Sequence, residues 1–328
     1  MKAMKLSDLH SFFIYAFFGY ALIFPGVLLF LRLLAIRCPG QRLQAYLVAL
    51  TAPFVGFVLF HTLLVKRCQA GILTTGPFWQ LFDAFCRGGY AAIGYLGPVL
   101  VGLLAIDLLK AVAGAVFVLR LRQQTAELPT DERERVNRLL TKSCAAVGLG
   151  LPEVVYCRRD NFVALVAGVR RPVLVLSAPL LVVFSDTELE HILLHELSHI
   201  RHGDTFTGWL LRLVKDAVFF SPFSGLLLER CLLEKERLCD LEVVRQTGGE
   251  ARAYAATLLK AWRLLLQRRE MKLGLAAKLV GAQNGLEWRV KSLLENEAAD
   301  RGKLCAPLFF ALLGTFFAGT ILLLGFIC

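Results

Sequence analysis

The sequence is short of charge. Only 19% of its 328 residues are charged and 56% are apolar, whereas about a quarter of the residues in a soluble domain are charged. Most of the apolar excess lies in four stretches, each long enough to cross a bilayer as a helix, which takes about 20 residues. The composition therefore argues against a wholly soluble protein and indicates an integral membrane protein.

The apolar stretches divide the chain. We expect a membrane region at residues 1–119, with transmembrane helices at about 11–34, 43–65 and 88–119, and a fourth transmembrane helix at 304–328. The segment between them, 120–303, should form a domain with short strands at Val154–Cys157 and Pro172–Ser177 among its helices. The predicted fold is mainly α, with an α+β domain inserted between the third and fourth membrane helices.

One part of this domain is itself apolar. Residues 205–228 carry long apolar runs, but the longest uncharged run is too short to span a bilayer. We expect this segment to associate with the membrane, as a surface or re-entrant element or as a helix packed under the site. A true span, which would invert the C-terminus, is the alternative.

The net charge of +11 is unevenly placed. Arg32, Arg37 and Arg42 crowd the connection between the first two predicted spans, and the segment Arg120–Lys303 carries 28 Lys or Arg against 23 Asp or Glu. Basic residues mark the cytoplasmic side of a membrane, so the inserted domain is predicted to face the cytoplasm. Attraction to anionic lipid of the bilayer explains the basic excess, and we expect no nucleic-acid partner.

Cysteine pairs of the kind that bind zinc are lacking. The nine cysteines show no repeated CxxC spacing, which argues against a zinc site made of thiolates. Cys68 and Cys86 flank the predicted outer loop, where an oxidising exterior would allow them to form a disulfide.

Histidine is scarce except in one segment. Of the six histidines, four lie in HILLHELSHIRHGD, from His191 to Asp204. Ser185, followed three residues later by Glu188, forms a capping box that starts a helix there, and Gly203 ends it. At 100° per residue the four histidines share one stripe of this helix, and most of its leucines lie on the other side.

The stripe contains an HExxH motif, from His195 to His199. Two imidazoles four residues apart on one helix face can reach the same tetrahedral zinc ion. Glu196 is turned about 100° away, too far to be a ligand on that face. It is placed to take a proton from a water molecule that zinc activates. The alternative is a helix whose polar stripe happens to be rich in histidine.

A catalytic zinc site needs a third protein ligand. His191 and His202 on the same helix, and carboxylates further along the chain, are the candidates. Glu236 and Asp240 are four residues apart and share a helix face, so one could bind zinc while the other holds a ligand histidine. A solvated acidic face explains the same spacing equally well.

These motifs resemble those of a known family. HELSH followed by HGD, then FFSPF at Phe219–Phe223 and EKERLCD at Glu234–Asp240, is similar to the membrane-embedded antirepressor metallopeptidases of the BlaR/MecR type. GVRRPVLVLS at Gly168–Ser177 is similar to the family's Gly-x-x-x-Pro strand, and the layout with a protease between the third and fourth spans also matches. A more distant likeness is to the CAAX-prenyl and heat-shock-type membrane proteases.

The resemblance implies a zincin-like domain. It implies Zn2+ bound by His195, His199 and Glu236, with Glu196 as catalytic base and Asp240 hydrogen-bonded to a ligand. It also implies a protein or peptide substrate, of which a cytoplasmic repressor is the family's example, and a place in the bacterial inner (cytoplasmic) membrane.

Two features depart from the family's pattern. Ser221 stands where the family has Asn before the proline. The sequence also lacks the S-x-x-K and K-T-G signatures of the penicillin-binding sensor found in the best-known members. We therefore do not expect this chain to sense β-lactams.

The predicted function is an integral-membrane zinc endopeptidase, with site-specific cleavage of a regulatory protein as its finer form. We expect the substrate to add as a strand along a sheet edge, formed by Pro172, Val173, Leu174, Val175, Leu176 and Ser177. His202 and Arg245 are the candidate oxyanion donors. The alternatives are a membrane signalling module with incidental or no proteolysis, and a scaffold that keeps zinc for structure. No oligomeric state follows from the sequence.

Overall fold

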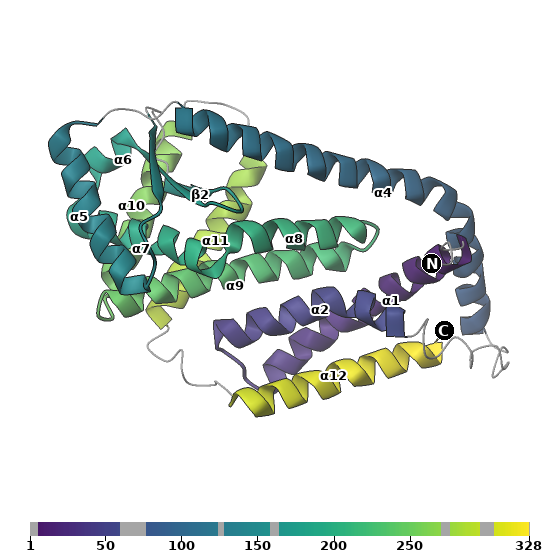
Figure 1. Cartoon of the computed structure of the whole chain (residues 1–328). Helices are drawn as coiled ribbons and strands as arrows, with labels where there is room; N and C mark the ends of the chain where they lie inside the picture. Colours follow the sequence, from purple (N-terminus) through teal and green to yellow (C-terminus); the bar gives the residue numbers. More distant parts are fainter. Residues whose placement is uncertain are drawn as a thin grey trace. The chain divides into compact units, whose positions relative to one another are not determined.

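The computed structural model of the chain describes residues 6–59, 77–123, 128–157, 164–269, 276–295 and 305–327. These residues are mainly helical, as predicted, and include a three-stranded sheet (Figure 1). They divide into two compact units, described separately below: Met1–Leu108 with Leu211–Leu232 and Ala299–Cys328, and Leu109–Leu210 with Leu233–Ala298. Cys68 and the side chain of Cys86 lie outside the described part of the chain, so their disulfide stays a prediction.

Two of the predicted spans have the length and composition of membrane helices. Within the described residues, Tyr15–Leu33 in α1 (Leu6–Leu33) and Pro98–Arg120 in α4 (Pro77–Gln123) are long and apolar enough to cross a bilayer. They correspond to the first and third predicted spans. The second and fourth, α2 (Pro39–Leu59) and α12 (Ala306–Ile327), stay predictions as spans, although both are helical.

The first unit is a group of apolar helices. α1, α2 and α12 lie side by side (Figure 1). The predicted segment 205–228 is not one element: it forms α8 (Asp204–Ala217), a turn, and the start of α9 (Pro222–Gln246). Its buried residues, among them Leu211, Val218, Leu227 and Leu228, pack into the same core as α1, α2 and α12. The expected association of this segment with the membrane itself stays a prediction.

The second unit is built on a small sheet. β1 (Glu153–Cys157), β2 (Ala164–Ala167) and β3 (Val173–Ser177) are ordered β1-β3-β2, with β1 parallel and β2 antiparallel to β3. β3 is therefore the central strand. The prediction that Pro172–Ser177 forms a substrate-binding edge is wrong, because β1 and β2 pair with the two sides of that strand. In the described part of the sheet the edge strands are β1 and β2.

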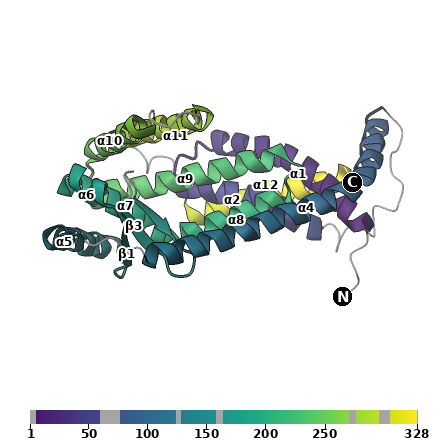
Figure 2. The same cartoon turned by 90° about the horizontal axis from the view of Figure 1, so that it is seen from above.

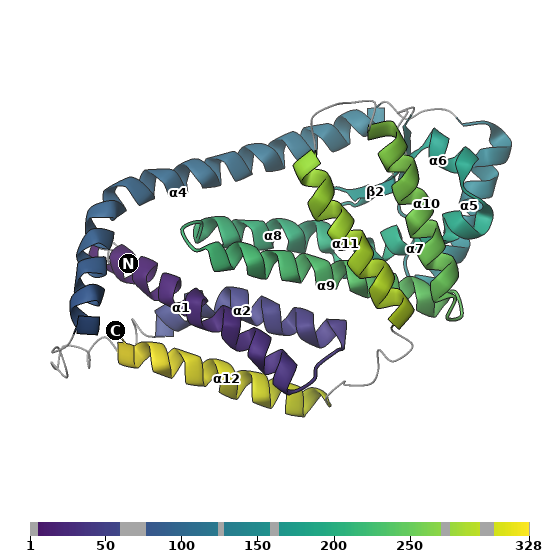
Figure 3. The same ribbon diagram turned by 180° about the vertical axis from the view of Figure 1, so that it is seen from behind.

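Helices complete the second unit. They are α5 (Thr130–Val147), α6 (Ala178–Val183), α7 (Asp186–His202), α10 (Ala251–Arg269) and α11 (Ala276–Glu295). Leucines of α5, β3 and α7 form the main core, namely Leu140, Leu174, Leu176, Leu189, Leu193 and Leu197. α10 and α11 lie alongside each other, as Figure 2 and Figure 3 show. They add Tyr254 and Leu293 to that core.

The helix that carries HExxH has the predicted ends. The backbone N–H of Glu188 donates to Oγ of Ser185 at 3.3 Å, and the N–H of Ser185 donates to Oε2 of Glu188 at 2.9 Å. Gly203 ends the helix in the left-handed conformation, with φ of 63°, which glycine adopts without a Cβ penalty. These caps, together with the leucines buried on the other side, fix the face on which the histidines stand.

Candidate active site

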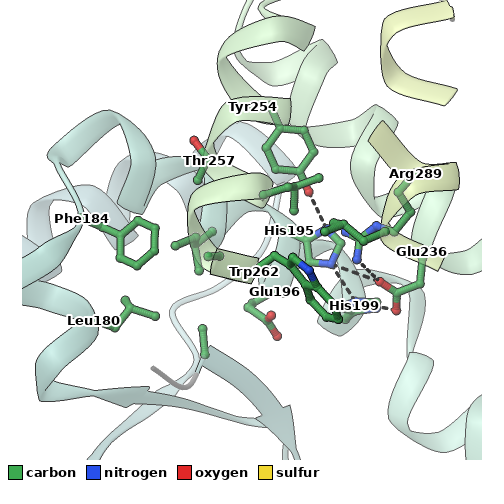
Figure 4. Close-up of a pocket in the computed structure, with 15 residues that line it drawn as sticks. Leu180, Phe184, His195, Glu196, His199, Glu236, Tyr254, Thr257, Trp262 and Arg289 are labelled. Carbon is green, nitrogen blue, oxygen red and sulfur yellow. Dashed lines mark hydrogen bonds and ion pairs between the residues drawn. The ribbon is translucent and has the colours of Figure 1, made fainter. Parts of the chain in front are cut away.

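The two histidines of the HExxH motif meet one carboxylate. Nε2 of His195 and Nε2 of His199 lie 3.2 Å apart on one face of α7. The carboxylate of Glu236, on α9, faces both: Oε2 is 3.5 Å from Nε2 of His195, and Oε1 is 3.6 Å from Nε2 of His199. Figure 4 shows the three side chains converging. The carboxylate that spacing alone left undecided therefore lies against both imidazoles.

These three side chains fit a tetrahedral metal ion. Their ligand atoms all lie within 4.8 Å of one another. Zinc–nitrogen bonds of about 2.0–2.1 Å at tetrahedral angles would separate two ligand nitrogens by roughly 3.3 Å, close to the observed 3.2 Å. Two imidazole nitrogens this close require a proton or a cation between them, because their lone pairs would otherwise face each other. Two imidazoles and a carboxylate are also a donor set that catalytic zinc sites use.

A carboxylate holds the far nitrogen of each imidazole. Nδ1 of His199 donates to Oδ2 of Asp204 at 2.8 Å, and Nδ1 of His195 lies 3.2 Å from Oδ1 of Asp240. A proton at Nδ1 leaves Nε2 free to act as a ligand. Burial would raise the pKa of Asp204, but hydrogen bonds from His199 and from Lys235, whose Nζ lies 2.6 Å from Oδ1, outweigh it and lower the pKa.

Two residues that the sequence motifs did not include complete this network. The hydroxyl of Tyr254, on α10, donates to Oδ1 of Asp240 at 2.6 Å and lies 3.0 Å from Nδ1 of His195. Arg289, on α11, donates through Nε and Nη2 to Asp240 at 2.8 and 2.5 Å. Its Nη1 lies 3.0 Å from Oε2 of Glu236. The network therefore draws on helices well beyond the motif-bearing part of the chain.

The sequence holds a signal for one of these two residues. Arg289 stands between Leu286 and Leu293 at helical spacing, in the stripe that α11 turns inward. An arginine in an apolar stripe has to find an anionic partner, because a buried unpaired charge is costly. Tyr254 stands among apolar residues of α10 like any core aromatic, so no local pattern marks it.

His195, His199 and Glu236, with the side chains that hydrogen-bond to them, form one cluster. The electrostatics of this cluster favour a positive charge at the imidazoles. Burial would lower the pKa of His195, but hydrogen bonds with Asp240 and Glu236 outweigh it and raise the pKa to about 9. Burial would raise the pKa of Glu236, but contacts with His195 and Arg289 lower it to about 2. Hydrogen bonds from His195 and Arg289 likewise hold the pKa of Asp240 below its usual range, against the effect of burial. The two carboxylates are therefore anions that attract a proton or a metal cation to the imidazoles.

Glu196 faces a pocket beside the cluster. The pocket has a volume of about 340 Å³ and is lined on its polar side by His195, Glu196, His199, Glu236, Tyr254, Thr257 and Arg289. Apolar side chains form the remainder, namely Ala164, Leu180, Phe184, Ile192, Leu258, Ala261, Trp262 and Leu286 (Figure 4). Burial raises the pKa of Glu196. Ala164 belongs to β2, so an edge strand of the sheet borders the pocket.

Other predicted residues lie elsewhere. His202 is exposed, and the side chain of Arg245 is 65% exposed and pairs with Glu242 at 2.7 Å. Neither lines the pocket, so their predicted oxyanion role gains no support. His191 is buried, and its Nδ1 lies 2.9 Å from Oγ1 of Thr257. It is a hydrogen-bonded neighbour of the cluster, with its ring 5.6 Å from that of Tyr254.

A second group with metal-ligand chemistry shares His199. Sγ of Cys239 is 3.4 Å from Nδ1 of His199 and 3.8 Å from Oδ2 of Asp204. Burial, and then the charge of Asp204, raises the pKa of the Cys239 thiol far above its usual range. A protonated thiol is a poor ligand, and Lys235 already pairs with Asp204. The arrangement therefore favours a metal on the Nε2 side of His199.

Comparisons with known proteins match this part of the chain. The family model described as BlaR1 peptidase M56 matches residues 96–293, which include the whole cluster. Protease HtpX of Escherichia coli O127:H6 is 36% identical over 93 residues, which cover 27% of this chain and 31% of that protein. HtpX homologues of Bacillus licheniformis and Nitrosomonas eutropha are 31% and 27% identical over 149 and 151 residues, in each case 44% of this chain and 49% of the homologue. The chain thus spans less than half the length of these curated relatives.

Proposed function

The chain belongs to the BlaR1 peptidase M56 family, and from this premise we propose that it is an integral-membrane zinc endopeptidase. The observation that carries the proposal is the meeting of His195, His199 and Glu236 in one pocket with Glu196. Two helices that are long and apolar enough to cross a bilayer support the membrane part.

The residues of the pocket have separate tasks in peptide hydrolysis. His195, His199 and Glu236 would hold the zinc ion, which when bound supplies Lewis acidity to the scissile carbonyl and to the attacking water. Glu196 takes a proton from that water and passes it to the leaving amine. Its pKa, raised by burial, suits this exchange, because a carboxyl group whose pKa is nearer the working pH both accepts and returns a proton.

The substrate would enter as an extended strand. β2 is an edge strand in the described sheet and places Ala164 at the border of the pocket, so a peptide could add to it by main-chain hydrogen bonds. Phe184 and Trp262 are among the apolar side chains that line the pocket. We infer that these apolar side chains accept an apolar side chain of the substrate.

The test compares Glu196→Gln with a matched variant on the same helix. Glu190 pairs with Lys142 at 2.8 Å and does not line the pocket, so Glu190→Gln is the control. Purified full-length proteins digest a library of proteome-derived peptides, and mass spectrometry identifies the cuts. We expect Glu196→Gln to lose activity by about 100-fold or more and Glu190→Gln to keep it. Identical peptide profiles from the wild type and Glu196→Gln would contradict the proposal.

The finer proposal is that the natural substrate is a regulatory protein at the cytoplasmic face of the inner membrane. Its support is the resemblance to antirepressor metallopeptidases and the basic excess of the segment Arg120–Lys303. In cells that express wild type or Glu196→Gln, quantitative proteomics should find one or a few proteins that accumulate only with the variant. Accumulation of many unrelated proteins would indicate a broad substrate range instead.

A further inference from the structure

Arg289 joins the two carboxylates of the site. Its Nε and Nη2 atoms bind Asp240 as a fork, and its remaining terminal nitrogen, Nη1, lies 3.0 Å from Oε2 of Glu236. A bidentate contact of this kind fixes the plane of the guanidinium as well as its position. Only 17% of the arginine side chain is exposed. The guanidinium is therefore a rigid link between α9 and α11.

α11 holds Arg289 in place through its neighbours. Leu293, one turn further on, is 3% exposed and packs into the main core of the second unit. The ring of Trp288 lies 5.6 Å from the guanidinium carbon of Arg237 on α9, a cation–π contact. Together they fix the rotation of α11, so that Arg289 faces the pocket.

The two oxygens of Glu236 are in different surroundings. Oε2 accepts from Arg289 and is 3.5 Å from Nε2 of His195, whereas Oε1 faces Nε2 of His199 at 3.6 Å. A catalytic zinc site with three protein ligands keeps a fourth position for water or substrate. A carboxylate that used both of its oxygens would crowd that position. Whether Oε2 also binds the metal therefore determines whether the fourth position stays open to water or substrate.

We propose that Arg289 is a positioning residue that engages Oε2 of Glu236 and so presents the carboxylate to the metal through one oxygen, Oε1. The inference rests on the proposed function, since it requires a metal ion held by His195, His199 and Glu236. Loss of Arg289 frees Oε2 to bind as well and leaves Asp240, which is 1% exposed, without its cation.

The test loads the purified full-length protein with Co2+ in place of Zn2+, because the visible bands of Co2+ weaken when a ligand is added. Competition with a chromophoric chelator gives the affinity for Zn2+. We expect Arg289→Gln to weaken that affinity about 10- to 100-fold, the usual cost of losing a partner that orients a ligand, and to weaken the Co2+ bands. Arg289→Lys keeps the charge but not the planar fork. Its affinity for Zn2+ and the intensity of its Co2+ bands should therefore lie between those of the wild type and Arg289→Gln.

Two variants separate this role from a general loss of structure. Tyr254→Phe removes a hydroxyl that contacts Asp240 and His195 but leaves the contact of Arg289 with Glu236. Its affinity for Zn2+ should therefore fall, while the intensity of its Co2+ bands, which follows the number of ligands, should equal that of the wild type. Arg135→Gln, on α5, removes an arginine with three hydrogen bonds elsewhere in the same unit. It should lower stability without changing the affinity for Zn2+.

Several outcomes would overturn the inference. One is a wild-type affinity and a wild-type Co2+ spectrum in Arg289→Gln, even if peptide hydrolysis is lost, which would assign Arg289 to the oxyanion. Another is a Co2+ spectrum altered equally in Tyr254→Phe. If Arg289→Gln does not fold, Arg289→Lys takes its place in the test. A wild-type Co2+ spectrum in Arg289→Lys would then contradict the inference. Failure of the proposed metal site is a separate result: His195→Ala would then bind Co2+ as well as the wild type.

Discussion

Single residues of the cluster differ in how far the sequence predicts them. His195 and His199 follow from spacing, because helix geometry places residues four apart on one face. Glu236 and Asp240 share a spacing that is equally common on solvated helices. Only the packing of α9 against α7 shows that these two carboxylates face the imidazoles rather than solvent. Tyr254 reaches the cluster from a distant segment, and such a contact depends on how helices pack rather than on any local pattern.

Glu236→Gln tests the carboxylate directly. A neutral amide is a weaker zinc ligand than a carboxylate, so we expect the variant to bind zinc about 100-fold or more weakly and to lose peptide hydrolysis. Elemental analysis after dialysis gives the zinc content per chain. Glu242→Gln is the control on the same helix, because Glu242 pairs with Arg201 and Arg245 away from the pocket. Equal zinc content in Glu236→Gln and the wild type would rule out this ligand.

Among the elements, α7 and β3 show what local sequence can and cannot determine. The ends of α7 are set by Ser185, Glu188 and Gly203, all of which act within a few residues, and the prediction of this helix is confirmed. The edge or central place of β3 depends on which strands pair with it. Its unbroken apolar run is in fact typical of a strand buried on both faces, and Pro172 precedes it and so removes no ladder hydrogen bond. β2 is short and rich in alanine, which has little preference for strands.

The cap of α7 should make stability depend on pH. Glu188 accepts from Nζ of Lys260 at 2.6 Å as well as from Ser185. Burial would raise its pKa, but the hydrogen bonds from Lys260 and Ser185 outweigh it and lower the pKa. Since the pKa is lower in the folded protein, the stabilisation is present at neutral pH. This stabilisation is lost as the pH falls below the pKa of a glutamate in the unfolded chain, about 4.3, and through the lower pKa of Glu188 in the folded protein.

We therefore expect Glu188→Gln to lower the free energy of unfolding by about 1 kcal/mol at pH 7, and by progressively less below about pH 4. Thermal unfolding of the purified protein over this pH range measures the difference. Glu295→Gln, at an exposed position on α11, serves as the control and should have a smaller effect. A difference between Glu188→Gln and the wild type that does not vary with pH would contradict the assignment.

For the whole molecule, hydropathy predicts membrane segments better than it predicts boundaries. α1 and α4 contain stretches with the length and composition of spans, at the places expected. The compact unit that holds the site begins at Leu109 and is interrupted by Leu211–Leu232, whereas the composition indicates one continuous domain at 120–303. Local hydropathy cannot locate such an interruption, because the segment mixes charged and apolar residues, and tertiary packing decides where they lie.

The orientation of the chain can be tested with single cysteines. Cys38 lies in the predicted cytoplasmic connection, and Cys305 lies at the start of the last predicted span and is exposed. In variants that keep only one of them, a membrane-impermeant maleimide should label neither in intact spheroplasts and both after permeabilisation. Gln69→Cys, in the predicted outer segment, should be labelled in intact spheroplasts. The reverse pattern would mean that the protease domain faces outward.

The cluster takes its side chains from α7, α8, α9, α10 and α11, and Arg289 is the last of them along the chain. During synthesis the ribosome therefore delivers the HExxH helix well before the guanidinium that is proposed to hold Glu236. A chain that ended before α11 would carry the HExxH motif and Glu236, but the carboxylate of Glu236 would lack its contact with Arg289. On the role proposed for Arg289, a growing or truncated chain is a poor protease, and the activity develops only when the domain is complete.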